Sequence, residues 1–269
     1  GAVASMKGVA MQVDGGLAVF DLTHEIPPYD IWQAAYRLRQ TMPYWPAGTV
    51  FVSVVDPGVG TDRKSVVLKT KSGHLVVTPD NGTLTLVSED LGVDAVRVID
   101  ESVNRLAGSQ ASHTFHGRDV YAYTGARLAA GVITFDAVGP LLEGDVVRIA
   151  HERARREGEV LIGGVPALDV RYGNVWTNIG EGLFAQLEPA LGDGFRVELL
   201  REGTRVYEAD MPFVRSFGDV GHGEPLLYFN SVMNVALALN MRSFAEVHAI
   251  TAGGEWQVRI QKVTTANRD

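Results

Sequence analysis

The sequence predicts an α/β protein of two domains, and three observations lead to that prediction. In the first part, short β-branched runs alternate with helical apolar spacing, which is typical of a parallel sheet with helices on its faces. From residue 159 onward, short strand-like segments are separated by Gly, Asn and Asp, which indicates an antiparallel barrel or sandwich. Between them, HERARREGE is dense in charge and lacks apolar periodicity. We therefore predict domains at 1–150 and 159–269, joined by a linker at 151–158.

Composition narrows the class of protein. A chain of 269 residues that is 46% hydrophobic is long enough for a large core. Its net charge of -8 gives no general basic character for binding nucleic acid or an anionic membrane. The chain has no cysteine, which excludes disulfides and thiolate chemistry. No apolar run approaches the roughly 18 residues of a membrane span, so we expect a cytoplasmic protein with neither membrane nor nucleic acid as partner.

The first elements follow a strand, helix, strand order. Residues 1–13 already have helical spacing, as if the chain enters an element under way, so we expect a segment upstream to be missing. Leu17–Phe20 is predicted to be a short strand. Asp30 is placed to cap a helix, because apolar residues follow it at helical spacing: Ile31, Ala34, Ala35 and Leu38. The run Thr49–Val55 is predicted to be a buried strand.

Later elements are predicted from the same patterns. In the first domain we expect a hairpin, a further strand and a helix that ends at Gly131, over residues 65–68, 75–78, 93–99 and 119–130. In the second domain we expect strands around residues 161, 167–171, 175–178, 195–200, 204–208 and 226–229. Residues 263–269 are polar and are predicted to form a tail.

A polar loop follows the predicted strand Thr49–Val55. It carries the carboxylate of Asp56 and the guanidinium of Arg63, with Gly58 and Gly60 between them. Open α/β sheets place ligand-binding groups at the carboxyl ends of their strands, so these residues are candidates for a site. Asp-Pro-Gly is also an ordinary turn sequence, which leaves a structural role open. A dinucleotide site is not predicted, because Arg63 stands where the third glycine would be.

His116 is the second candidate. It lies in a polar loop just before the predicted helix 119–130, and helix N-termini favour anions and reacting groups. A purely structural histidine is the alternative. His113 and His116 have no His, Asp or Glu partners at recognised ligand spacing, so no metal site is predicted.

Seven segments together resemble one family, the S-adenosyl-L-methionine hydroxide adenosyltransferases, which are relatives of the fluorinase and chlorinase enzymes. They are MKGV at 6–9, DLTHEIPPYDI at 21–31, VVDPGVGTDR at 54–63, PDNG at 79–82, FHGRD at 115–119, YGNVWTNI at 172–179 and LLYFNS at 226–231. They cover most of the chain in the family's order. The resemblance implies an α/β domain with a central, mostly parallel sheet, a C-terminal antiparallel β-barrel, and a homotrimer with sites between neighbouring subunits.

The reaction that the resemblance implies is attack of water-derived hydroxide on C5′ of S-adenosyl-L-methionine, giving adenosine and L-methionine without a cofactor. The family's catalytic set falls on Asp56, Arg63 and His116. Our hypothesis is that Arg63 fixes Asp56, and that Asp56 and His116 orient one water in line with the bond to sulfur.

The resemblance also implies substrate contacts for six residues: Tyr29 over the sugar, Asn174 and Phe217 at adenine, Ser231 at the methionine carboxylate, and Phe115 and Gly117 beside His116. In two respects the chain departs from the family. Val232 follows Ser231 where the halogenating relatives have Arg, so the carboxylate needs other donors. The family's first strand and its acidic loop have no counterpart at the start of this sequence.

Two other functions remain open at this point. The first is a halide-dependent adenosyltransferase of the same fold; halide-using relatives carry Tyr where Asp56 stands, and an aspartate there repels an incoming anion. The fluorinating branch also has an insertion before its counterpart of Pro79, which this chain lacks. The second is a protein that binds adenosyl ligands without catalysis, a reading that the missing segment suggests.

Overall fold

The structure is a computed structural model that describes residues 1–263. The chain divides into two compact units, Gly1–Ile149 and the chain from Ala150 onward, and each is described by itself. The polar tail expected at 263–269 lies, from residue 264, outside the described residues. No helix in the described part of the chain is long and apolar enough to span a bilayer.

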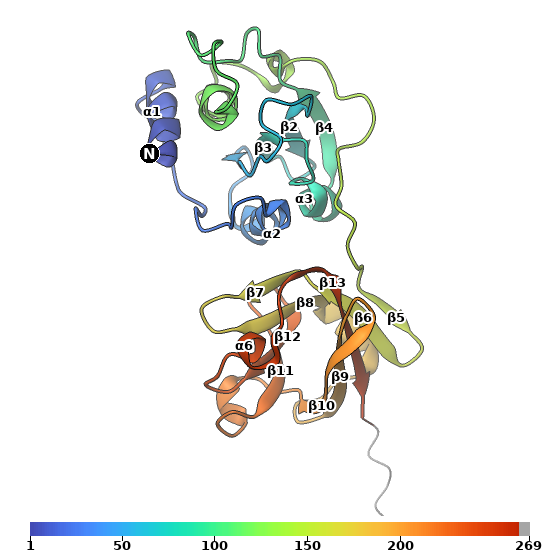
Figure 1. The fold of residues 1–269 in the computed structure, drawn as a ribbon. Helices are drawn as coiled ribbons and strands as arrows, with labels where there is room; N and C mark the ends of the chain where they lie inside the picture. The colour runs from blue at the N-terminus through green and yellow to red at the C-terminus, as the bar shows by residue number, and fades with distance from the viewer. Residues whose placement is uncertain (264–269) are drawn as a thin grey trace, which may run out of the picture. The chain divides into compact units, whose positions relative to one another are not determined.

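The first unit contains one four-stranded sheet, and its helices come before, between and after the strands along the chain (Figure 1). Its elements are α1 (Ala2–Val13), α2 (Ile31–Thr41), η1 (Met42–Tyr44), β1 (Val50–Val52), β2 (Ser65–Thr70), β3 (Leu75–Pro79), α3 (Thr85–Asp90), β4 (Val93–Val98), η2 (Gly117–Ala122), α4 (Tyr123–Ala129) and η3 (Phe135–Val138). The predicted cap of α2 is confirmed, because the Asp30 side chain accepts a hydrogen bond from the Gln33 amide.

The sheet has the strand order β1-β3-β2-β4, and only β1 and β3 run parallel. The expectation of a mostly parallel sheet is therefore wrong. The predicted hairpin is present between β2 and β3, and its short connection forces an antiparallel pair. The expected strand Leu17–Phe20 is also wrong: these residues lie outside every strand, and Phe20 is 67% exposed. An extended segment needs a neighbouring strand to be stable, and this one has no ladder partner among the described residues.

Apolar residues alternate along the central strands, so each face of the sheet carries its own core. Val66 and Leu68 pack in one cluster with residues of α2 and α3, while Val67 and Val77 pack in another with residues of η2 and α4. Helix α1 packs against η2 and α4. The α/β class of this unit is thus confirmed, with helices covering both faces of the sheet.

The second unit is mainly β-structure (Figure 1). Its elements are β5 (Arg155–Glu157), β6 (Val160–Val165), β7 (Ala167–Asp169), β8 (Asn174–Gly180), α5 (Glu181–Phe184), η4 (Ala185–Leu187), β9 (Gly194–Arg201), β10 (Thr204–Pro212), η5 (Phe217–Asp219), β11 (Pro225–Phe229), β12 (Asn234–Leu239), α6 (Phe244–His248) and β13 (Gly253–Lys262). Strand β5 lies within the stretch 151–158 that was expected to be a linker, and it pairs with β6.

These strands form two antiparallel sheets, ordered β10-β9-β13-β6-β5 and β11-β12-β8-β7. Both contribute to one shared core, in which Trp256, Phe195 and Ile179 are almost fully buried. A barrel needs continuous ladders between all neighbouring strands. Between the two sheets, the described residues show only an isolated bridge from Phe213 to Leu227. The closed barrel implied by the family resemblance is therefore not found, although the antiparallel character of the unit is.

Candidate active site

The loop that follows β1 is a compact series of turns. The Val59 amide donates to the Asp56 carbonyl at 3.2 Å, and the Thr61 amide donates to the Gly58 carbonyl at 3.1 Å. The loop is also fixed at its base, because the side-chain amide of Asn81 donates to the Val55 carbonyl at 2.9 Å. The PDNG segment is one of those that carry the family resemblance, and its asparagine positions the residue before Asp56.

Gly60 brings this loop against the segment that carries His116. Its φ of +78° lies in the left-handed region, and a Cβ at this position would lie 3.0 Å from the His113 carbonyl oxygen. Any larger residue would both strain the backbone and push the two segments apart. Glycine at position 60 therefore keeps the loop close to the segment before η2.

Asp56, Arg63 and His116 form one buried cluster. Arg63 donates to both oxygens of Asp56, with Nε to Oδ1 at 2.8 Å and Nη2 to Oδ2 at 2.5 Å. The same Nη2 lies 3.0 Å from Nδ1 of His116. The side chains are only 5% exposed for Asp56 and 10% for Arg63. Two carboxylate bonds from one planar guanidinium fix the carboxylate in orientation as well as in position.

These contacts determine the tautomer of His116. A guanidinium has only N–H donors, so Nδ1 of His116 must accept, and in the neutral ring the proton then lies on Nε2. That Nε2 atom is buried without a hydrogen-bond partner among the described residues. Burial lowers the pKa of His116, with Glu101 opposing the shift and Arg63 adding to it. His116 is thus held through Nδ1 by the guanidinium that also binds Asp56, and it presents a free N–H donor at Nε2.

Gly117 explains how His116 reaches this position. It is the first residue of η2, a turn of π-helix, which is a form often found at functional sites. A Cβ on Gly117 would lie 3.2 Å from a Val54 methyl carbon and 3.5 Å from the Met6 sulfur. The π-turn therefore packs directly on the strand end that leads to Asp56. Phe115 precedes it, with the guanidinium of Arg118 4.9 Å from the centre of its ring.

Three further polar residues surround the cluster, and no sequence pattern indicated them. The Ser65 hydroxyl accepts from Nη1 of Arg63 at 2.9 Å and lies 3.1 Å from the Tyr121 hydroxyl. Tyr121 donates to Oδ2 of Asp56 at 3.5 Å. Oε1 of Glu101 lies 3.5 Å from the Ser65 hydroxyl. Ser65 and Tyr121 occupy ordinary positions in a buried strand and an apolar helical face, where only the folded structure reveals their contacts.

In the second unit, Asn174 and Phe217 are both close to Tyr228. Asn174 is 3% exposed at the start of β8, and its side chain and that of Trp176 both act on the Tyr228 hydroxyl to lower its pKa, against the effect of burial. The ring of Phe217 lies 4.9 Å from the ring of Tyr228. Burial is the main cause that raises the pKa of Tyr228 to about 12. Tyr228 and Trp176 lie inside two of the matching segments, but sequence reasoning did not single them out.

Ser231 lies in the tight turn between β11 and β12, where it is exposed. The neighbouring Asn230 accepts hydrogen bonds from the amides of Val232 and Asn234, which fixes its side-chain oxygen. The Asn230 amide nitrogen is then buried without a partner among the described residues. It is an available donor close to Ser231 in the chain, in a segment where Val232 offers none.

Tyr29 lies in the first unit, in the turn before α2. Its side chain is 78% exposed, and its φ of +71° is unusual for a residue other than glycine. The structure therefore places an aromatic ring on the surface of that turn. Among the described residues, no hydrogen bond or ring contact joins Tyr29 to Asp56, Arg63 or His116.

The comparisons with known proteins agree on one family. Models of the SAM hydroxide adenosyltransferase N-terminal and C-terminal domains match residues 1–139 and 163–257. The chain belongs to the SAM hydroxide adenosyltransferase family. A relative from Salinispora tropica named (R)-S-adenosyl-L-methionine hydrolase is 37% identical over 96% of this chain and 92% of its own. A relative of the same name from Thermus thermophilus is 36% identical, over 93% of this chain and 91% of its own.

Two further relatives extend the comparison. A fluorinase from an Actinoplanes species is 29% identical over 93% of this chain and 90% of its own. A crystal structure of an uncharacterized conserved protein from Thermotoga maritima superposes with a TM-score of 0.87 at 34% identity, covering 97% of this chain and 95% of the other. In terms of the family, Asp56, Arg63 and His116 lie in the N-terminal domain, while Asn174, Phe217 and Ser231 lie in the C-terminal domain.

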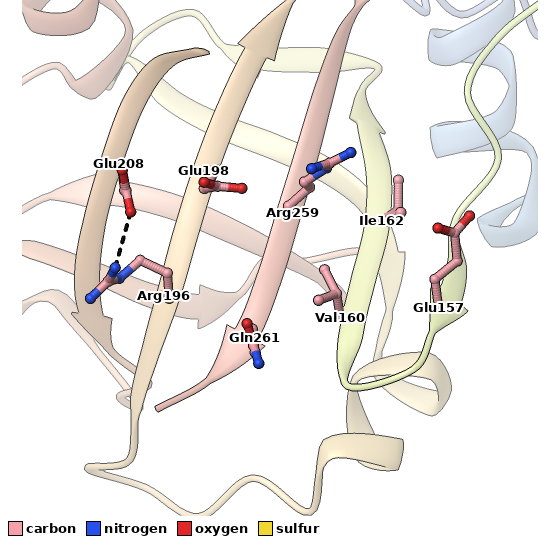
Figure 2. A pocket seen from close by; sticks show the side chains of 8 residues that line it. All are labelled: Glu157, Val160, Ile162, Arg196, Glu198, Glu208, Arg259 and Gln261. Atoms are coloured by element: carbon pink, nitrogen blue, oxygen red, sulfur yellow. Dashed lines mark hydrogen bonds and ion pairs between the residues drawn. The ribbon is translucent and has the colours of Figure 1, made fainter. Parts of the chain in front are cut away.

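A hollow of about 350 Å³ on the five-stranded sheet is a separate feature (Figure 2). Its walls include Arg196, Glu198, Glu208 and Arg259. The charges there are largely paired with one another, as in the 3.0 Å contact from Arg196 to Glu208 and the same distance from Arg205 to Glu198. None of the residues that the family resemblance singles out line it. Neither this hollow nor any other group of described His, Asp and Glu side chains forms a metal site.

Proposed function

We propose that this chain hydrolyses S-adenosyl-L-methionine by attack of water on C5′, giving adenosine and L-methionine. The observation that carries the proposal is the buried cluster of Asp56, Arg63 and His116, in which one guanidinium holds both a carboxylate acceptor and a histidine with a free N–H donor. Family membership and the names of the relatives support the same reaction. A cluster of this kind has an obvious use in orienting a water molecule.

The proposed roles follow from the hydrogen-bond pattern. Nε2–H of His116 donates to the oxygen of the nucleophilic water, and a carboxylate oxygen of Asp56 accepts one of its hydrogens. Asp56 takes the proton as the C–O bond forms, since Nδ1 of His116 is occupied by Arg63. A weak base is sufficient, because the proton leaves from an oxygen that is already bonding to carbon. The sulfur departs as a neutral thioether, so the reaction needs no general acid.

Positioning supplies much of the expected rate. A water held in line with the bond from C5′ to sulfur reacts as if it were part of the same molecule. Such positioning lowers the activation free energy by up to about 7–11 kcal/mol in favourable cases. The sulfonium is already an activated leaving group. We therefore propose that the reaction uses no metal or organic cofactor besides the substrate itself.

We further propose that the (R) sulfonium epimer is the preferred substrate. The support is that relatives from Salinispora tropica, Methanocaldococcus jannaschii and Thermus thermophilus all bear the name (R)-S-adenosyl-L-methionine hydrolase. Epimers at sulfur differ in where the methyl group points when the adenosyl and methionine parts are held. A site that binds both parts therefore distinguishes them by shape.

For the remaining contacts we keep the assignments that the family resemblance implies. Asn174 and Phe217 bind adenine, Tyr29 covers the sugar, and Ser231 binds the methionine carboxylate. The buried amide of Asn230 supplies a donor that Val232 cannot. We also propose the homotrimer with sites at subunit interfaces; light scattering of the purified protein tests it, and a monomer would refute it.

The test is product analysis with pure (R) and (S) epimers, with and without excess chloride. We expect adenosine from the (R) epimer in both conditions, carrying heavy oxygen when the reaction is run in labelled water. A chlorinated nucleoside would instead support the halide-dependent alternative, and ligand binding without any product would support the non-catalytic one.

Asp56→Asn tests the assignment of the proton acceptor. We expect turnover to fall by about 10²–10⁴-fold, the usual contribution of a positioned acid or base, with little change in substrate affinity. Asp62→Asn is the matched control, because Asp62 lies exposed in the same loop. Unchanged turnover in Asp56→Asn would refute the role of Asp56.

A further inference from the structure

Each turnover of the proposed reaction releases one proton inside a buried cluster. Sulfonium and water give adenosine, methionine and H⁺, so the proton that Asp56 accepts must reach solvent before the next cycle. Asp56 itself is only 5% exposed, and its two oxygens are bonded to Arg63. His116 cannot take the proton at Nδ1 while Arg63 donates there. The site therefore needs an exit for protons.

A chain of hydroxyl groups leads away from Asp56. The Tyr121 hydroxyl lies 3.5 Å from Oδ2 of Asp56 and 3.1 Å from the Ser65 hydroxyl. The Ser65 hydroxyl in turn lies 3.5 Å from Oε1 of Glu101. Tyr121 and Ser65 are 0% and 4% exposed, whereas the Glu101 side chain is 34% exposed. The chain thus joins a buried carboxylate to one that contacts solvent.

We propose that Tyr121, Ser65 and Glu101 form a proton relay that carries the reaction's proton from Asp56 to solvent. Protonated Asp56 donates to the Tyr121 oxygen, the Tyr121 hydrogen moves to the Ser65 oxygen, and the Ser65 hydrogen moves to Oε1 of Glu101. Three O–H bonds break and three form, Asp56 is again a carboxylate, and Glu101 releases the proton to water. The relay rests on the proposed function, since it serves that reaction.

The surroundings fix each member of the relay. Nη1 of Arg63 donates to Ser65 and so holds its hydroxyl oxygen, while the guanidinium lies 5.6 Å from the centre of the Tyr121 ring. Oε2 of Glu101 accepts from Arg105 at 2.6 Å, which leaves Oε1 facing Ser65. Arg105 is itself anchored to the Ser112 carbonyl at 2.6 Å.

The electrostatics keep the relay hydroxyls neutral. Burial is the main cause that raises the pKa of Tyr121 above its usual range, so its hydroxyl stays protonated and able both to accept and to donate. In this state two hydroxyls stand between two carboxylates. Their O–H bonds align in one direction when Asp56 holds the proton and in the opposite direction after transfer.

Two variants test the relay, because each removes one transfer step while conserving shape. Tyr121→Phe removes the hydroxyl and keeps the ring in its core, and Glu101→Gln removes the terminal acceptor at a half-exposed position. Tyr123→Phe is the matched control, since it removes a neighbouring hydroxyl that is outside the chain of contacts. Circular dichroism and thermal unfolding verify that each variant is folded.

Steady-state adenosine formation is measured in dilute buffer and again with increasing imidazole at constant pH and ionic strength. We expect turnover of both variants to fall about tenfold or more in dilute buffer, with the rate of Glu101→Gln rising as imidazole replaces the missing acceptor. Tyr123→Phe and the unaltered protein should not respond to imidazole. A structural role for Glu101 predicts a loss that imidazole does not restore.

The outcomes separate the two proposals. Wild-type rates in either variant, or a loss in Glu101→Gln that does not respond to imidazole, would overturn the relay while leaving the hydrolase intact. Absence of adenosine from the unaltered protein with either epimer would overturn both.

Discussion

Arg63→Lys is the sharpest test of how the cluster works, because it keeps the positive charge and removes the planar fork. Arg63 makes four polar contacts, two with Asp56, one with Ser65 and one with His116. An ammonium group presents its donors from a single nitrogen and cannot span these partners. We expect lysine to keep an ion pair with Asp56 and to lose the contacts with Ser65 and His116.

The magnitude follows from the two lost contacts. Hydrogen bonds that involve a charged group contribute about 1.5–3 kcal/mol each, so the loss is about 3 kcal/mol at the lower end. When this loss is assigned entirely to the transition state, turnover should fall about a hundredfold, at about 1.4 kcal/mol of activation free energy for each factor of ten. Without the bond from Arg63, Nδ1 of His116 is also free to carry a proton, which removes the fixed donor at Nε2.

Turnover and KM for adenosine formation measure this effect. The loss should appear in turnover rather than in KM, because Arg63 is assigned to the nucleophile and not to the substrate. Arg97→Lys is the matched control: Arg97 also donates to a carboxylate, that of Asp136, and its second bond goes to the Gly139 carbonyl at 2.7 Å instead of to a member of the cluster. Turnover within about threefold of wild type in Arg63→Lys would refute the orienting role.

Two further predictions concern stability. Gly60→Ala should lower the free energy of unfolding by more than Gly48→Ala in urea titrations. Both glycines have positive φ, but of the two only Gly60 approaches another segment closely. Strain of this kind costs about 1–3 kcal/mol, and equal losses in the two variants would contradict the close approach. For His116, the folded pKa is lowered, so its contribution is present above the unfolded pKa of about 6.5 and is lost as pH falls through the folded pKa. His116→Gln should flatten that part of a stability-pH series, and an unchanged slope would show that His116 does not titrate there.

Local features of the fold were predictable from sequence. The cap at Asp30 and the β2–β3 hairpin depend on neighbouring residues alone, and both are present. Long-range pairing was not predictable. Leu17–Phe20 has the composition of a strand but no partner strand in the described chain. The antiparallel direction of β4 against β2 depends on the course of the chain that connects them, which no local sequence pattern predicts.

The candidate site likewise combines local features that the sequence predicts with long-range contacts that it does not predict. Asp56 and Arg63 lie seven residues apart in one loop, and the sequence could place them together. That His116 joins them depends on Gly60 and Gly117, whose missing side chains allow close approach. Ser65 and Tyr121 are common residue types in a strand and a helix, so their polar contacts with the cluster appear only when β2 and η2 are packed together around Arg63.

The charge balance of the cluster bears on the choice between water and halide. Asp56 and Arg63 neutralise each other, as do Glu101 and Arg105, and His116 is neutral at physiological pH. A halide that entered would lose its hydration and gain the Nε2–H donor of His116, with no net positive charge in the paired cluster to compensate for that loss. Water loses less on entry and uses both the donor and the acceptor. The arrangement therefore selects for a nucleophile that brings its own hydrogen, and it is this hydrogen that the relay through Tyr121 must then remove.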